Sequence, residues 1–118
     1  MLALSGAAAR GQTPPAGDPV KGQALFDECA ACHSLKPDDN GSGPTLFGLF
    51  GRPSASIDGY NYSAPMRRAN VAWTPELLDG FLTDDQAPPF RGNRMPFAGI
   101  ADAGERRDLI AYLQQATH

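Results

Sequence analysis

Residues 29–33 of this chain read CAACH, which brings two cysteines and a histidine within five positions. Cys29 and Cys32 are the only cysteines in the sequence, and the one other histidine is His118. Residues three and four apart on a helix share one face, so Cys29, Cys32 and His33 can meet the same planar ligand. The spacing is typical of covalent haem attachment, in which each thiol adds across a vinyl group to form a thioether and the imidazole reaches the iron. The run therefore predicts one haem c, with His33 as an axial iron ligand.

Two other chemistries use the same residue types. A Cys-x-x-Cys pair can be a redox dithiol, but that use belongs to a βαβ setting, and the chain has only two valines and three isoleucines for strands. A zinc site needs four ligands. The cysteines and histidines of the chain are Cys29, Cys32, His33 and His118, and their spacing suits zinc poorly. We favour haem and keep the dithiol and metal-binding readings as alternatives, which free thiols in the purified protein would support.

A haem iron that carries electrons needs a second protein ligand, and a thioether raises the reduction potential relative to a second imidazole. The methionines are Met1, Met66 and Met95. Met95 lies in a stretch rich in proline and glycine, where the backbone can approach a haem closely. A lone methionine is equally typical of core filling, so from the residues alone its role stays open.

The composition predicts a small, loop-rich, all-α domain to position these residues. Its 13 glycines and 11 prolines make up about a fifth of the 118 residues, and alanine is far commoner than the β-branched residues. Start signals predict helices over residues 19–31, 63–69 and 74–82, and a final one after Asp102. The intervening stretches, 34–62 and 83–100, are predicted loops whose length requires something else to organise them.

The two ends of the chain differ in character. We interpret residues 1–17 as the remnant of a signal peptide followed by a flexible leader, since an apolar start ends in small residues, although the basic n-region is missing. Residues 18–118 form the predicted domain. The net charge of −3 argues against a nucleic-acid partner, and no apolar run approaches the roughly 20 residues that cross a bilayer. We expect an exported, periplasmic protein, because haem attachment suits an oxidising compartment.

Ordered motifs flank the CAACH run on both sides. Lys21-Gly22 and Phe26 precede it, and it is followed by GPTLFGLFGR at 43–52, GYNYS at 59–63, Trp73, NRMPFAGI at 93–100 and DLIAYL at 108–113. Together they resemble the class I cytochromes c of the mitochondrial type and their soluble bacterial relatives, over residues 18–117. The resemblance implies that the first and last helices cross, through Gly22 and Phe26 against Leu109 and Tyr112, and that the loops wrap one haem.

The same resemblance implies roles for individual residues. His33 is the implied proximal ligand and Met95 the distal one, and the carbonyl of Pro44 accepts the His33 Nδ1–H, which orients the ring. Phe97 joins the implied haem pocket. The residues implied to hold the haem propionates by hydrogen bonds are Arg52, Tyr62, Ser63, Trp73 and Asn93. For Trp73 and Tyr62, a plain core role fits the residue types equally well.

Two departures from that family stand out. Phe81 occupies a position where the mitochondrial proteins usually carry a tyrosine whose hydroxyl bonds near the methionine sulfur, which leaves the strength of the Met95–iron bond open. The ring of lysines is also missing, because the chain has only two lysines. The arginines Arg67, Arg68, Arg91 and Arg94 can supply a smaller positive patch, set against Asp84 and Asp85, or can belong to an ordinary surface of mixed charge.

The resemblance thus implies a soluble monohaem electron carrier, not an enzyme, whose iron cycles between Fe(III) and Fe(II). We place it in a respiratory chain and keep photosynthetic and catabolic pathways as alternatives. We expect a monomer whose partners are redox proteins, either membrane oxidase or reductase complexes or periplasmic dehydrogenases. The alternative is a haem protein with a labile Met95 ligand that acts as a small-ligand sensor or weak peroxidase.

Overall fold

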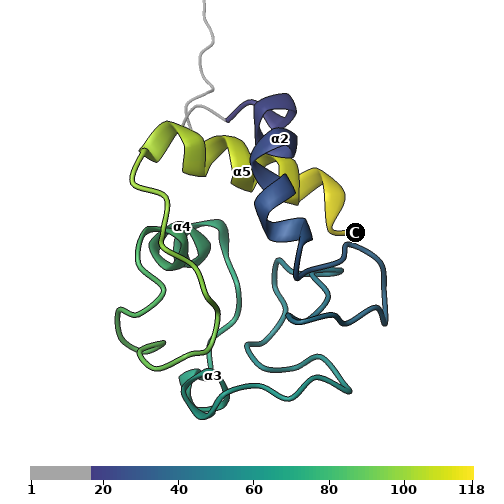
Figure 1. Cartoon of the computed structure of the whole chain (residues 1–118), viewed down its shortest axis with the longest axis vertical. Coiled ribbons are helices and arrows are strands. Elements are labelled where there is room, and N and C mark those ends of the chain that lie inside the picture. The colour runs from purple at the N-terminus through teal and green to yellow at the C-terminus, as the bar shows by residue number, and fades with distance from the viewer. Residues whose placement is uncertain (1–16) are drawn as a thin grey trace, which may run out of the picture.

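The computed structural model describes residues 17–118, so the predicted leader lies outside the described residues except for Gly17. Four helices form, joined by long loops (Figure 1). They are α2 (Pro19–Ala30), α3 (Ala64–Ala69), α4 (Pro75–Thr83) and α5 (Ala103–Ala116). No β-strand occurs in this described part of the chain. The predicted all-α, loop-rich fold is therefore confirmed.

Side-chain caps start three of the helices where the sequence predicts them. Asp18, Thr74 and Asp102 each accept a backbone N–H of the first turn, at 2.9, 3.0 and 2.8 Å. Such a cap satisfies one of the free donors at a helix start. Ser63 precedes α3 but forms no side-chain cap, so its hydroxyl is free for another use.

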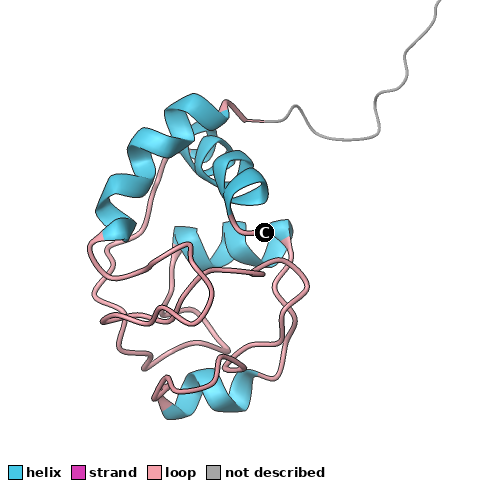
Figure 2. Ribbon diagram, turned by 90° about the vertical axis from the view of Figure 1, so that its right-hand side faces the viewer, coloured by secondary structure: helices cyan, strands magenta, loops and turns pink. Residues whose placement is uncertain are grey.

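Helices α2 and α5 cross closely at one end of the molecule, while α3 lies at the other (Figures 1 and 2). At the crossing, a Cβ placed on Gly22 would lie 1.9 Å from the Asp108 carbonyl oxygen and 2.8 Å from the Tyr112 Cβ. Only a residue without a side chain allows this approach. One turn further on, the rings of Phe26 and Tyr112 lie 5.6 Å apart, and Leu109 is fully buried. The helix crossing implied by the resemblance is thus present.

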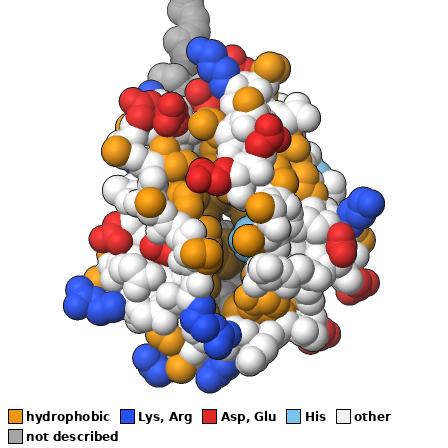
Figure 3. Space-filling view, viewed as in Figure 1, with side chains coloured by type: hydrophobic (Ala, Val, Ile, Leu, Met, Phe, Trp, Pro, Cys, Tyr) orange, Lys and Arg blue, Asp and Glu red, His pale blue; other side chains and the backbone are white. Residues whose placement is uncertain are grey.

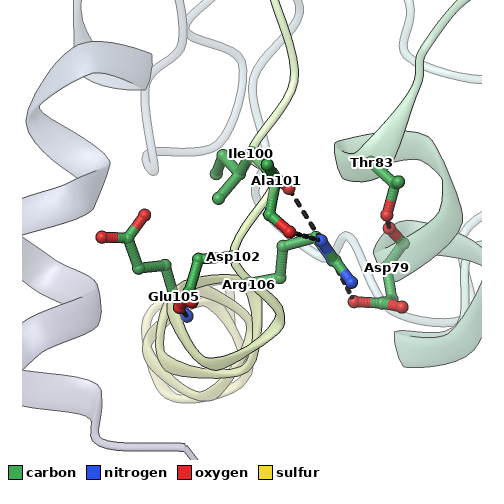
Figure 4. A network of polar contacts seen from close by, with 7 residues as sticks. All are labelled: Asp79, Thr83, Ile100, Ala101, Asp102, Glu105 and Arg106. Carbon is green, nitrogen blue, oxygen red and sulfur yellow. Dashed lines mark hydrogen bonds and ion pairs between the residues drawn. The ribbon is translucent and has the colours of Figure 1, made fainter.

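Arg106 ties α5 to α4 and to the segment that runs between them (Figure 4). Its Nε lies 2.8 Å from Oδ1 of Asp79 on α4, and its Nη1 donates to the carbonyls of Ile100 and Ala101 at 2.8 and 3.0 Å. The Ile100 N–H donates in turn to the Leu82 carbonyl at 2.8 Å. These bonds close the base of the loop that carries Met95.

Candidate haem site

The two long loops and the helices enclose a cavity of about 600 Å³, within the usual range for small-molecule sites. The segment after α2 lines it from one side of the view in Figure 1, and the segment between α4 and α5 lines it from the other. In the space-filling view the molecule is hollowed near its centre, with apolar side chains gathered around the opening (Figure 3). Every predicted cofactor-binding residue lines this cavity: Cys29, Cys32, His33, Pro44, Arg52, Tyr62, Ser63, Trp73, Asn93, Met95 and Phe97.

The His33 ring is held in one orientation. Its Nδ1 lies 2.7 Å from the Pro44 carbonyl oxygen, and since a carbonyl only accepts, the proton must be on Nδ1. A Cβ on Gly43 would lie 2.4 Å from the ring, so that glycine leaves room for it. Burial lowers the pKa of His33, the bond to Pro44 opposes this, and the positive Arg52 adds to the lowering. The ring is therefore neutral, with the Nε2 lone pair free to bind a metal.

The two cysteines lie at and just beyond the end of α2, are partly buried and form no disulfide with each other. Burial raises the pKa of Cys29, and the neighbouring Glu28 and Cys32 raise it further. A reactive dithiol needs the opposite shift, toward an easily formed thiolate. His118 lines a separate pocket of about 330 Å³ and not this cavity, so the soft ligands do not converge on one point. Neither the dithiol nor the zinc alternative gains support.

Two buried polar atoms in the cavity wall have no hydrogen-bond partner: the Nε of Arg52 and the Oγ of Ser63. Arg52 spends its Nη1 on the carbonyls of Thr45 and Phe47, both at 2.9 Å, which fixes the side chain in place. Buried donors without partners are costly, so their presence together indicates a missing acceptor. A cofactor that carries carboxylates, as a porphyrin does in its propionates, would supply one.

Tyr62 lines the same wall and uses its hydroxyl oxygen to accept the Ile57 N–H at 3.1 Å. The hydroxyl proton has no acceptor within the described residues. Burial raises the pKa of Tyr62, partly offset by the bond from Ile57. The phenol therefore stays neutral and can donate toward a ligand in the cavity.

Trp73 is a core residue and a cavity residue at once. Its ring stacks on Phe90 at 5.4 Å and meets Phe81 edge-on at 5.3 Å. No side-chain hydrogen bond of Trp73 occurs within residues 17–118, and the residue lines the cavity. The aromatic cluster thus fixes the ring and leaves its polar edge available.

Met95 and Phe97 reach the cavity from the loop between α4 and α5. The Met95 N–H donates to Oδ1 of Asn93 at 2.8 Å, and the Phe97 N–H donates to the Met95 carbonyl at 2.9 Å. Both N–H groups of the Asn93 side chain are spent on backbone carbonyls, so its contact with propionates stays a prediction. Met66 also lines the cavity, from α3, so the structure brings two thioethers to the site.

Phe81 is buried and lines the cavity beside the same loop. Its ring packs against Trp73 and Phe90, and it brings no hydroxyl to this wall.

A paired thiol motif, an oriented neutral imidazole, two thioethers, an apolar lining and unpartnered donors together suit a covalently attached porphyrin. These features define a c-type haem site. In the comparisons, the family model described as Cytochrome c matches residues 19–117. Among curated relatives, the cytochrome c2 of Blastochloris viridis is 40% identical over 101 residues, covering 85% of this chain and 79% of its own.

Two further relatives match over nearly their whole lengths. The cytochrome c of Chlamydomonas reinhardtii is 43% identical over 105 residues, 87% of this chain and 93% of its own. The cytochrome c2 of Rhodopila globiformis is 39% identical over 105 residues, 88% of this chain and 97% of its own. The chain belongs to the cytochrome c family: it is a monohaem electron-transfer protein that binds haem c covalently through Cys29 and Cys32.

Some residues important to the site were not singled out from the sequence. Thr45 is buried, and its hydroxyl donates to the Lys36 carbonyl at 2.5 Å and accepts the Phe47 N–H at 3.1 Å. Its own carbonyl holds Arg52. A threonine after Gly-Pro is a weak signal, because hydroxyls bond local backbone in many loops.

The four arginines of the predicted patch do lie together. Arg67 and Arg68 are exposed at the end of α3, and Pro65 of that helix lies 3.2 Å from where a Gly92 Cβ would be, which brings the Arg91–Arg94 segment alongside. Basic side chains gather at this end of the molecule in Figure 3. Within residues 17–118 the Arg106–Asp79 pair is the only ion pair, so none of the four arginines forms one there.

Proposed function

We propose that this protein shuttles single electrons with His33 and Met95 as the two axial ligands of one haem. Bound haem iron supplies the one-electron Fe(III)/Fe(II) couple. The observation that carries the proposal is the convergence of His33 and Met95 on one cavity whose wall also holds Cys29 and Cys32. The hydrogen bonds that fix His33 and Met95 keep the ligands still between oxidation states, which keeps reorganisation small.

The ligand assignment is tested by replacing each cavity methionine. Met95→Ala should abolish the Met-to-iron absorption of the ferric holoprotein and admit cyanide rapidly. Met66→Ala, the matched control in the same cavity, should keep that absorption. If Met66→Ala loses the absorption and Met95→Ala keeps it, the assignment is wrong.

For partners, we propose redox proteins with an acidic docking surface that meets the arginine patch formed by Arg67, Arg68, Arg91 and Arg94. Opposite charges speed such encounters, and salt weakens them. Arg67 and Arg94 donate to the carbonyls of Tyr62 and Asn61, so replacing them would also disturb the fold. Arg68 and Arg91 are exposed and form no hydrogen bond within the described residues.

The docking test therefore uses Arg68→Gln and Arg91→Gln together, with Lys21→Gln and Arg107→Gln together, at exposed positions on α2 and α5, as the control of equal charge change. The patch variant should transfer electrons to a membrane oxidase or reductase more slowly at low salt, and with a weaker dependence on ionic strength. A transfer rate indifferent to salt in the wild type contradicts the role of the patch.

We also propose that the protein works as a monomer in a respiratory chain of a bacterial periplasm. Residues 1–17 would then be an export leader, and residues 18–118 the domain that is exported. Within the described residues, no helix is both long and apolar enough to cross a membrane. Fractionation of cells that express the full chain tests the compartment, and mass determination of the mature protein tests the cleavage.

A second candidate function follows from Phe81, which brings no hydroxyl to the cavity near Met95. If the Met95 bond opens readily, the iron can bind small ligands or reduce peroxide. Rapid carbon monoxide binding by the native ferrous protein would favour this function, whereas slow binding would favour the plain carrier.

A further inference from the structure

The loop between α4 and α5 cannot hold its shape with an ordinary backbone ladder. Pro88 and Pro89 have no N–H to donate, and Gly92 has a φ of 92°, outside the helical and strand regions. Nevertheless this loop presents Met95 to the cavity. Its geometry comes from three backbone turns, between residues 84 and 87, 87 and 90, and 90 and 93, together with side-chain hydrogen bonds.

The side chain of Asn93 supplies three of them. Its side chain is buried, and its Nδ2 donates to the carbonyls of Asp85 at 2.6 Å and Phe90 at 3.1 Å. Its Oδ1 accepts the Met95 N–H at 2.8 Å. One amide thus joins the start of the loop, its middle and the residue that carries the thioether.

Gln86 adds a second connection across the same loop. Its Oε1 accepts the Gly92 N–H at 2.8 Å, and its Nε2 donates to the Asn93 carbonyl at 3.3 Å. The residue is exposed, yet both ends of its amide are used on the backbone next to Asn93. A shift of Gln86 therefore moves Asn93, and a shift of Asn93 moves Met95.

We propose that Gln86 and Asn93, the amide pair, are positioning residues that hold Met95 against the haem iron. The inference rests on the proposed function, in which Met95 is the distal ligand. Neither side chain is charged, so replacing either with a neutral residue changes no net charge near the iron. Weakening the pair increases how often the Met95–iron bond opens, and an external ligand then binds faster.

The test uses the haem-loaded protein with Gln86→Met, which keeps the length of the side chain and removes both hydrogen bonds. The matched control is Gln115→Met, at an exposed position on α5. The ferric proteins are mixed with cyanide, and the binding rate and Met-to-iron absorption are measured. Gln86→Met should bind cyanide about fivefold faster than wild type, as expected for two partly exposed hydrogen bonds. Gln115→Met should match the wild type.

Asn93→Ala extends the test, because it should raise the rate further, and combining it with Gln86→Met should give less than the product of the two effects. If Asn93→Ala does not fold, Gln86→Met decides alone. An unchanged cyanide rate in Gln86→Met, with or without a lower denaturation midpoint, overturns the inference. Absence of Met-to-iron absorption in the wild type overturns the proposed ligation and this inference together, whereas its presence with an unchanged Gln86→Met rate overturns this inference only.

Discussion

Replacing Gly22 with alanine tests how tightly the helix crossing is set. The new Cβ would lie 1.9 Å from the Asp108 carbonyl oxygen, and an ordinary contact begins near 3.4 Å, so α2 and α5 must separate by roughly 1.5 Å. That movement loosens the packing of Phe26 on Tyr112 and around Leu109. Overpacking costs about 1–3 kcal/mol, here near 3 because the clash is with backbone, and the better helix propensity of alanine returns only about 1 kcal/mol.

We expect Gly22→Ala to lower the free energy of unfolding by about 2 kcal/mol and the melting temperature by about 10 °C. Gly80→Ala in α4 is the matched control, since a Cβ there meets nothing within 4 Å, and it should raise the stability by about 0.5–1 kcal/mol. Both are measured on the haem-loaded protein by denaturant unfolding, followed by far-ultraviolet circular dichroism. If Gly22→Ala is as stable as wild type, or Gly80→Ala is equally damaging, the close contact at the crossing is refuted.

Three further predictions concern pH, the Arg106 clamp and the haem. Burial raises the pKa of Tyr62 in the folded protein. The contribution of Tyr62 to stability is therefore fully present below the ordinary tyrosine pKa and is lost as pH rises through the raised pKa. Tyr62→Phe should flatten this alkaline loss of stability, measured by unfolding at a series of pH values. Arg106→Met should destabilise by about 2 kcal/mol in denaturant unfolding, while exposed Arg107→Met stays within about 0.5 kcal/mol of wild type. Protein made without haem exposes the apolar lining of the cavity to water, and its circular dichroism should show a largely unfolded chain with no cooperative transition.

The helices could be predicted from sequence because their start signals are local. The side chains of Asp18, Thr74 and Asp102 each accept a backbone N–H from a residue no more than three positions further on. Both partners of each bond can therefore be recognised in one short stretch of sequence. Ser63 shows the limit of this reasoning. The same residue type precedes a helix there without capping it, because its hydroxyl lies in the cavity wall instead.

The residues of the site likewise fall into those predictable from local spacing and those that depend on distant segments. The CAACH spacing is local and predicts the attachment chemistry directly, whereas the choice between Met66 and Met95 depends on how distant segments fold together. The bond from Arg106 to Asp79 spans 27 residues, and no pattern in either segment indicates the other. Gln86 was equally hidden, since a polar residue in a turn-rich stretch predicts only a loop, and Asn93 was expected to bind propionates, not to hold the backbone at Met95.

If the arginine patch docks partners as proposed, its order before binding has a consequence for the entropy of docking. A free arginine on a surface samples many rotamers, and fixing it in a complex costs about 0.5–1.5 kcal/mol. Arg67 and Arg94 already donate to the carbonyls of Tyr62 and Asn61, so much of that ordering is complete before any partner arrives. Two of the four positive charges thus form a fixed pattern, which favours a partner whose acidic groups match it in position as well as in sign.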